Sequence, residues 1–232
     1  MKITPEERQE ILALYKDLRV ADVRDGMDWN MLHCQGSLSP DIRPLWRTRA
    51  VGMARTARYL PYTGPIPRMT PEEYTQWVGW YYNTVCTYPW VQSIQPGDFM
   101  VIDQSETNVG LCGSNNTLDI QKRGARGLVS NGGVRDTDEI ILQKIPFWSK
   151  YCSQTMVQAR LQFDAMDIPV QVGGVTVHPG DIVVADGDGV VVVPLKQAKE
   201  VAQYATREFV NDKAARRAKY EDMGLELDDS VK

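Results

Sequence analysis

The segment from residue 99 to about residue 145 constrains the fold more than any other part of the chain. An apolar run, a glycine-rich loop at 110–116 and a helical segment come in that order, and a second set follows with its loop at 131–136. This repeated order favours a βαβ unit with parallel neighbouring strands. We therefore expect an α/β fold in which both loops lie at the carboxyl ends of the strands, where open α/β sheets bind ligands.

The second of these loops carries the residues best suited to chemistry. Gly132 and Gly133 let the backbone adopt positive φ and approach a ligand closely, and the helix start expected after them attracts anions. Arg135 offers a planar fork for a carboxylate or phosphate, and Asp136 offers a hard oxygen ligand for Mg²⁺. We expect this loop to form the active site. The alternative is an ordinary helix cap with a salt-bridging arginine.

Two capping-box patterns predict helix starts earlier in the chain: Thr4 with Glu7, and Thr70 with Glu73. We expect helices over 5–19 and 70–87, and a half-buried strand over 50–60. The second helix carries an aromatic face. Stacking on nucleic acid or sugar is one interpretation, but core packing or a subunit interface is favoured. The aromatic residues are Tyr74, Trp77, Trp80, Tyr81 and Tyr82.

The C-terminal half favours β-structure followed by a long helix. The sequence Pro-Gly-Asp precedes an apolar strand at 95–103 and again at 178–186, and Pro-Gly suits a type II turn. The 186–189 stretch is expected to be a hairpin turn. The pattern of residues 195–221 predicts a long charged helix, and an acidic tail follows it in the sequence. Because no linker divides the chain, we expect one domain over 1–232, with an N-terminal helix in 1–20 and a C-terminal helix and tail in 195–232.

Composition excludes several classes of protein. The net charge is −4 without a basic block, so direct nucleic-acid binding is not expected, and no apolar run is long enough to span a membrane. Only two histidines are present, which excludes a multi-histidine zinc site and favours an oxygen-bound metal. The four cysteines have no CxxC spacing, and the first residues are too charged for a signal peptide. We therefore expect a cytoplasmic protein with free thiols.

Several motifs together resemble the RraA-like family over roughly residues 20 to 205. They are Gly113, Arg123-Gly124, Gly127, the run from Gly132 to Asp136, the run from Val177 to Asp181, and the run from Asp188 to Pro194. The family includes class II 4-hydroxy-4-methyl-2-oxoglutarate / 4-carboxy-4-hydroxy-2-oxoadipate aldolases and the regulator of ribonuclease activity. The resemblance implies a single-domain α/β/β/α sandwich of the swivelling type with a mixed sheet, assembled as a homotrimer or homohexamer.

The resemblance also implies roles for the site residues. Asp136 would hold Mg²⁺ or Mn²⁺, largely through waters, and Arg135 would bind the carboxylate and carbonyl of a small 2-oxo acid. The substrate would also contact the Gly113-Ser114 loop and the backbone N–H groups of Asn115 and Asn116. The implied enzyme is a lyase that cleaves a C–C bond of a 4-hydroxy-2-oxo acid through a pyruvate enolate. Oxaloacetate decarboxylase activity would share that enolate.

The chain departs from the aldolases at one position. They carry an acidic residue directly after the glycine that corresponds to Gly113, whereas this chain has Ser114. An uncharged alcohol weakens the case for metal binding and proton transfer. This favours either another substrate or the alternative function, a non-catalytic protein-binding regulator of the ribonuclease type. The substrate and the acid–base residue of a neighbouring subunit stay open, with Glu208, Asp212 and Glu221 as candidates for the latter.

Overall fold

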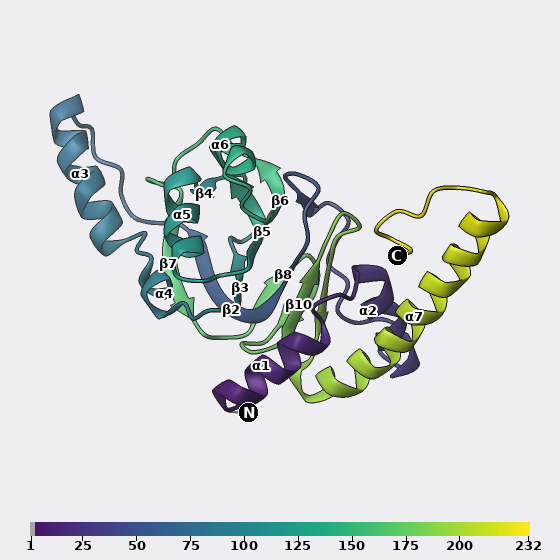
Figure 1. The fold of residues 1–232 in the computed structure, drawn as a ribbon. Helices are drawn as coiled ribbons and strands as arrows, with labels where there is room; N and C mark the ends of the chain where they lie inside the picture. Colours follow the sequence, from purple (N-terminus) through teal and green to yellow (C-terminus); the bar gives the residue numbers. More distant parts are fainter. Residues whose placement is uncertain (1–2) are drawn as a thin grey trace.

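The computed structural model describes residues 3–232, and it consists of a curled mixed sheet with helices on both sides (Figure 1). Within these residues the main sheet has nine strands, with the order β1-β6-β5-β3-β2-β10-β11, while β4 pairs with β5 and β7 with β2. Its strands are β1 (Arg43–Pro44), β2 (Ala50–Pro61), β3 (Asp98–Asp103), β4 (Gly110–Cys112), β5 (Gly127–Val134), β6 (Phe147–Cys152), β7 (Leu161–Met166), β10 (Ile182–Ala185) and β11 (Val190–Val193). A separate hairpin is formed by β8 (Val170–Val172) and β9 (Val175–Val177).

The parallel part of the sheet confirms the predicted βαβ order. Strands β2, β3, β5 and β6 pair in parallel, while β1, β7, β10 and β11 pair antiparallel to their neighbours. Two helices follow the parallel strands: α5 (Ser114–Lys122) precedes β5 and α6 (Thr137–Leu142) follows it. The starts of these helices therefore lie at the same end of the sheet, as expected for the two loops.

The layers follow from three apolar clusters. One lies between the sheet and α4 (Pro89–Ser93), α5 and α6, and it includes Trp90, Ile120 and Ile140. A second lies inside the curled sheet, where Phe99 and Trp148 are buried against β8, β10 and β11. The third lies under the helices α1 (Pro5–Leu14), α2 (Val20–Trp29) and α7 (Ala198–Asp222). Helix, sheet, sheet and helix layers in this order confirm the predicted single α/β domain with a mixed sheet.

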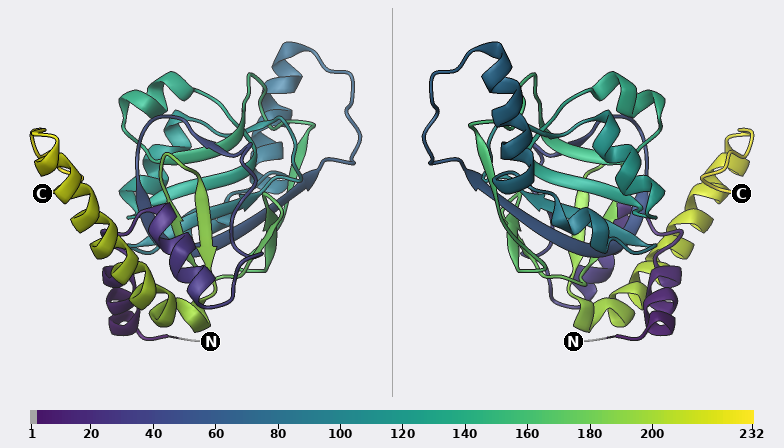
Figure 2. Two further views of the ribbon diagram at one scale, coloured as in Figure 1. Left: turned by 90° about the vertical axis from the view of Figure 1, so that its right-hand side faces the viewer. Right: turned by 90° about the vertical axis from the view of Figure 1, so that its left-hand side faces the viewer.

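The predicted helix starts are also confirmed. Helix α1 (Pro5–Leu14) and helix α3 (Pro71–Thr84) each begin with a complete capping box. Helix α2 spans Val20–Trp29, and a short η1 (Leu195–Gln197) leads into α7 (Ala198–Asp222). In Figures 1 and 2, α3 and the distal part of α7 project from the body on opposite sides.

Some local predictions are wrong. The 110–116 loop is shorter than expected, because α5 begins at Ser114 rather than near residue 119. The strand expected at 128–130 continues through both glycines to Val134, so the predicted turn at Gly132 and Gly133 is absent. The strand after residue 146, β6, was not predicted at all. Its pairing with both β1 and β5 is a tertiary effect that local sequence does not encode.

Candidate functional site

The two predicted loops meet at Asp136. The Ser114 backbone N–H donates to Asp136 Oδ2 at 3.1 Å, and the Ser114 hydroxyl lies 3.4 Å from the same oxygen. On the other side of the carboxylate, Arg135 Nε donates to Asp136 Oδ1 at 3.0 Å. Ser114 precedes Arg135 by 21 positions and Asp136 by 22, and it belongs to the other predicted loop. The structure brings these three residues together.

The backbone of Asp136 is unusual. Its φ of 55° and ψ of 43° lie in the left-handed region, and it occupies the N-cap position of α6 without forming a side-chain cap hydrogen bond. An L-residue in this conformation costs about 1–2 kcal/mol, and such costs gather at functional sites. The alternative of a helix cap with a salt-bridging arginine is therefore correct for the N-cap position and for the ion pair with Arg135, whereas the Asp136 side chain caps no N–H of α6.

Two glycines make room for this pair. A Cβ on Gly113 would lie 2.4 Å from Asp136 Oδ2, and a Cβ on Gly110 would lie 2.9 Å from Arg135 Cβ. Gly113 was expected at the site, whereas Gly110 was seen only as a loop glycine. In the sequence, both roles could have been predicted from the two glycines that bracket the short strand β4, which pairs with β5 just before Arg135.

Gly132 and Gly133 have a different role from the one expected. Neither has positive φ, so they do not form a ligand-approaching turn. A Cβ on Gly132 would meet the Gln104 side chain at 2.5 Å, and one on Gly133 would meet Ser153 Cβ at 2.8 Å. These glycines instead let neighbouring segments pack closely on β5, and the positive φ belongs to Asp136.

The electrostatics favour an ionised Asp136. Partial burial opposes ionisation, but the hydrogen bonds from Arg135 and the Ser114 backbone outweigh it and lower the pKa of Asp136 below its ordinary value. The Arg135 and Asp136 side chains are 35% and 33% exposed. Because such accessible ion pairs contribute little to stability, the pair is better placed to bind a ligand than to hold the fold.

The start of α5 adds two free donors beside Asp136. Thr117 N–H and its hydroxyl turn back to the carbonyl of Gly113. The N–H groups of Asn115 and Asn116 find no protein acceptor within residues 3–232. Donors of this kind at a helix start favour anions, so these amides are placed to bind a carboxylate next to the Arg135 guanidinium.

Tyr82 is a neighbour that the sequence prediction did not assign to the site. Burial raises the pKa of Tyr82, and the positive charge of Arg135 acts in the opposite direction. The aromatic pattern of α3 was the signal that could have indicated Tyr82.

Gly110 also contacts the 153–160 segment. Its backbone N–H donates to the carbonyl of Thr155 at 3.2 Å.

The donor set fits a hydrated Mg²⁺ or Mn²⁺ rather than a metal enclosed by protein ligands. Within residues 3–232 no three His, Cys, Asp or Glu side chains come together as a metal cluster, so Asp136 belongs to no such cluster. Mg²⁺ dehydrates reluctantly and is commonly held by one or two carboxylates with several waters. Each oxygen of Asp136 accepts at least one hydrogen bond and has remaining lone-pair capacity for a metal or its waters.

The candidate acid–base residues do not complete the site within one chain. Glu208 lies beside Arg207, Asp212 pairs with Arg19 and Arg216, and Glu221 pairs with Arg217. All three belong to α7, which lies across the molecule from α5 and α6 (Figure 1). One chain therefore supplies the anion-binding half of the site, and its proton donor is not among these residues.

The fold and this site define an α/β protein with a carboxylate–arginine pair at the ends of parallel strands. The RraA-like family model, described as Aldolase/RraA, matches residues 20–192. The chain belongs to the RraA-like family.

Individual relatives agree with this assignment. A protein of Halalkalibacterium halodurans named "Putative 4-hydroxy-4-methyl-2-oxoglutarate aldolase" is 32% identical over 126 residues, which cover 53% of this chain and 59% of that protein. The alignment thus spans less than two thirds of the relative's length.

Among solved structures, an uncharacterized protein from Pseudomonas syringae has a TM-score of 0.74 at 26% identity, covering 97% of this chain and 98% of that one. Streptomyces coelicolor RraAS2, described as an unusual member of the RNase ES inhibitor RraA protein family, has a TM-score of 0.71 at 26% identity, covering 89% and 96%. The predicted RraA-like fold is confirmed. Within residues 3–232, none of the helices combines the length and apolar character that crossing a bilayer requires.

Proposed function

We propose that this protein is a divalent-metal-dependent lyase of the class II aldolase kind, which cleaves a C–C bond of a 4-hydroxy-2-oxo acid. The observation that carries the proposal is the contact of Asp136 with both Arg135 and the start of α5. This arrangement brings together the Arg135 guanidinium, the ionised Asp136 carboxylate and the backbone N–H groups at the start of α5. These are the groups that a 2-oxo acid and a hydrated Mg²⁺ or Mn²⁺ need.

The roles of the protein groups follow from their positions. Arg135 would bind the carboxylate and the 2-oxo oxygen of the substrate, and the N–H groups of Asn115 and Asn116 would hold the same carboxylate. Asp136 would hold the metal, largely through waters. When bound, Mg²⁺ or Mn²⁺ supplies Lewis acidity at the 2-oxo group.

The reaction balances as a retro-aldol cleavage. The hydroxyl at C4 loses its proton, the bond between C3 and C4 breaks, and its electron pair forms the enolate of pyruvate. Arg135 stabilises the negative charge that develops on the enolate oxygen, and a proton then adds to C3. Loss of carbon dioxide from oxaloacetate leaves the same enolate, so we also propose oxaloacetate decarboxylase activity.

Ser114 bears on the choice of substrate. Its hydroxyl lies 3.4 Å from Asp136 Oδ2, where the aldolases carry an acid. A neutral hydroxyl leaves one negative charge fewer around the metal, which lowers metal affinity and accommodates a more acidic substrate. We propose that Ser114 marks a subgroup with a substrate different from that of the named relatives.

A coupled assay for pyruvate tests the proposal. Purified protein with Mg²⁺ or Mn²⁺ should release pyruvate from 4-hydroxy-2-oxo acids or oxaloacetate, and chelation should abolish the release. Arg135→Ala should lower kcat/KM by about 100-fold, since oxyanion donors contribute on that scale. Arg123→Ala is the matched control, because Arg123 is exposed and bonds only to Gln92. An undiminished rate in Arg135→Ala would contradict the proposal.

Binding can be followed without turnover. Oxalate resembles the enolate of pyruvate and should bind with Mg²⁺ to the wild-type protein, as measured by isothermal titration calorimetry. Asp136→Asn should remove the metal dependence of this binding. Equal oxalate affinity with and without Mg²⁺ in the wild type would exclude the metal role of Asp136.

The second candidate is a non-catalytic regulator that binds a ribonuclease. It is favoured by Ser114, by the likeness to an RNase ES inhibitor family member, and by the exposed aromatic residues of α3. Immobilised protein should then retain a purified RNase ES-type ribonuclease, and Asp136→Ala should leave the binding unchanged. Retention together with absence of pyruvate release across the substrates would replace the enzyme with the regulator.

We further propose a cytoplasmic homotrimer or homohexamer in which a neighbouring subunit supplies the missing proton donor. All four cysteines are free thiols in the described structure, and free thiols suit a reducing compartment. Its partners would then be its own copies and a small 2-oxo acid, with no direct nucleic-acid or membrane contact.

A further inference from the structure

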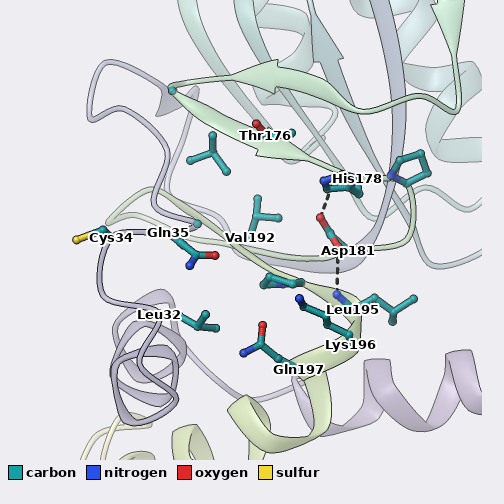
Figure 3. Close-up of a pocket in the computed structure, with 15 residues that line it drawn as sticks. Leu32, Cys34, Gln35, Thr176, His178, Asp181, Val192, Leu195, Lys196 and Gln197 are labelled. Carbon is teal, nitrogen blue, oxygen red and sulfur yellow. Dashed lines mark hydrogen bonds between the residues drawn. The ribbon is translucent and has the colours of Figure 1, made fainter. Parts of the chain in front are cut away.

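Figure 3 shows a cavity of about 830 Å³, whose lining does not include Arg135 or Asp136. Three walls enclose it: the loop from Leu32 to Gly36, the hairpin between β8 and β9, and the segment from Pro194 to Gln197 that leads into α7. Its volume falls in the range of roughly 300–1,000 Å³ that is typical of small-molecule sites. None of its lining residues belongs to the candidate active site, so it needs a separate account.

Asp181 fixes two of the walls relative to each other. Its carboxylate accepts the backbone N–H of His178 at 2.8 Å and that of Leu195 at 3.0 Å, as the dashed lines in Figure 3 mark. The Asp181 side chain is buried, and both of its oxygens are used by these bonds. The carboxylate therefore joins two walls of the cavity and holds them in place.

The loop wall is equally well held. Gly36 has a φ of +83°, and its carbonyl accepts the N–H of Val192 at 2.8 Å, with no room for a side chain there. The Arg24 guanidinium, on α2, donates to the backbone carbonyls of Leu32 and Gln35. A cavity with such fixed walls loses little conformational entropy when a ligand binds.

One lysine, Lys196, lines this cavity. Lys196 is exposed and makes no ion pair within residues 3–232, and His178 is exposed nearby. Apart from the buried Asp181, the remaining polar side chains are neutral, and six apolar side chains form the rest of the surface. The neutral residues are Cys34, Gln35, Thr176 and Gln197, and the apolar ones are Leu32, Val175, Pro179, Val192, Pro194 and Leu195.

We propose that this cavity binds a small organic anion, a carboxylate or sulfonate on an apolar body. Lys196 pairs with the anionic group, the amides of Gln35 and Gln197 donate to its oxygens, and the apolar side chains cover the body of the ligand. A hydrated inorganic anion fits less well, because the apolar surface gives it nothing in exchange for its lost water. This inference is independent of the proposed lyase activity.

The probe for the first test is anilinonaphthalene sulfonate, which carries a sulfonate on an apolar ring system and fluoresces when it binds. Gln197→Glu places a negative charge in the cavity with no change in size. Gln197 is the N-cap of α7, where an acid is favourable for the helix, so the variant should fold. Gln197→Glu and Lys196→Glu should each weaken the cavity's affinity by about tenfold, as expected for loss of a charge-assisted contact.

Lys199→Glu is the matched control. Lys199 stands three residues after Lys196, but it pairs with Glu10 at 2.9 Å and does not line the cavity. Its variant should bind the probe with an affinity within twofold of the wild type. Equal loss in Lys196→Glu and Lys199→Glu would mean that only long-range charge matters, and it would overturn the proposal.

A second readout reports this cavity alone. Cys34 lines it and is exposed, whereas Cys152 is exposed at the end of β6, outside the cavity. Neutral iodoacetamide alkylates both, and peptide mass spectrometry gives each rate separately. The probe should slow Cys34 and leave Cys152 unchanged, and Gln197→Glu should abolish this protection. Bright fluorescence without protection of Cys34 would place the probe elsewhere, for example on the aromatic helix α3, and would overturn the assignment.

Competition then defines the ligand class. Benzoate should displace the probe and lower its fluorescence, whereas acetate at the same concentration should leave the probe bound. In the absence of the probe, benzoate should itself protect Cys34 at concentrations where acetate and inorganic phosphate do not. Protection by phosphate alone would contradict the apolar half of the proposal.

Discussion

The backbone N–H of Ser114 donates to Asp136 Oδ2 at 3.1 Å, and this bond joins the first turn of α5 to the chain that leaves β5. The bond fixes the carboxylate against a helix start whose next two N–H groups are free. It also uses the backbone of Ser114 and not its side chain, so the geometry tolerates a serine where the aldolases carry an acid. The site is therefore organised by main-chain position, and the proposed chemistry would depend on Arg135 and Asp136.

The first prediction concerns the space beside Asp136. Gly113 has φ −121° and ψ −172°, which any residue adopts, so Gly113→Ala brings no backbone strain. The new Cβ would lie 2.4 Å from Asp136 Oδ2 and push the carboxylate off the Ser114 N–H. Because only the end of a side chain must move, stability should fall by less than about 1 kcal/mol, while misplacement should cost about 100-fold in pyruvate release.

Gly79→Ala is the matched control for this substitution. Gly79 lies inside α3, where an added Cβ meets nothing within 4 Å. Replacing glycine by alanine within a helix should raise stability by about 0.5–1 kcal/mol and leave activity unchanged. Chemical denaturation and the pyruvate assay measure both variants. Full activity in Gly113→Ala would show that the carboxylate position does not matter.

The second prediction concerns pH. Burial opposes the ionisation of Asp136, yet the hydrogen bonds from Arg135 and Ser114 lower its pKa in the folded protein. A lowered folded-state pKa stabilises the protein above the unfolded-state value of about 4, and this contribution is lost as pH falls through the folded-state value. The wild type should therefore be more stable than Asp136→Asn at pH 7, and the difference should shrink toward pH 3.

The size of this effect is limited by solvent. The Asp136 side chain is 33% exposed, so screening should keep the difference below about 1 kcal/mol. Urea titrations of both proteins at several pH values measure it. A difference that grows as the pH falls would mean that the carboxylate is protonated preferentially in the folded state, contrary to the hydrogen bonds observed.

Local chemistry in the sequence was sufficient for the helix starts and the repeated turns. Thr4 and Thr70 cap their helices as predicted, since a capping box involves residues only three apart. The two Pro-Gly-Asp turns were equally local, and Gly97 and Gly180 both have positive φ. The pairing of loops at the ends of parallel strands also followed from the order of elements.

The site itself depended on contacts that no local pattern contains. The sequence suggested a turn at Gly132, but the structure shows that a side chain there would clash with Gln104, the residue that follows β3. In the same way, the left-handed conformation of Asp136 arises because β5 runs to Val134 and α6 begins directly afterwards. The sequence therefore indicated Arg135, Asp136 and Ser114, which the fold brings into contact, and the tertiary packing determined which of them carries the unusual backbone.

The third prediction concerns the thiols. Burial raises the pKa of Cys86 and of Cys112 to about 12, whereas Cys34 and Cys152 are exposed. Since only the thiolate reacts, iodoacetamide at pH 8 should modify two cysteines in the native protein and all four in denaturant. Intact-mass spectrometry counts them. Cys112 lies at the end of β4 beside Gly113, so its native modification at the rate of Cys152 would mean that this strand opens readily.

The fourth prediction concerns the aromatic helix α3. Tyr81 is buried in the core, but Trp80 is 46% exposed and Tyr74 and Tyr82 are also exposed on a helix that projects from the body (Figure 2). Exposed apolar residues gathered in this way are typical of an interface between proteins, and we expect α3 to join copies of this chain in the proposed trimer or hexamer. Trp80→Ser should weaken assembly about thirtyfold, as loss of a tryptophan hot spot does.

Sedimentation velocity at several concentrations measures this effect, and Trp29→Ser is the matched control. Trp29 is 54% exposed, but it lies on α2 and stacks on Tyr204 of α7, on the other side of the molecule. If α3 forms the interface, the Trp80 variant dissociates and the Trp29 variant assembles as the wild type does. The reverse result would move the interface to α2 and α7. Because Glu208 and Asp212 lie on α7, it would also bring those carboxylates to a subunit boundary, where a neighbouring Arg135 and Asp136 could use them.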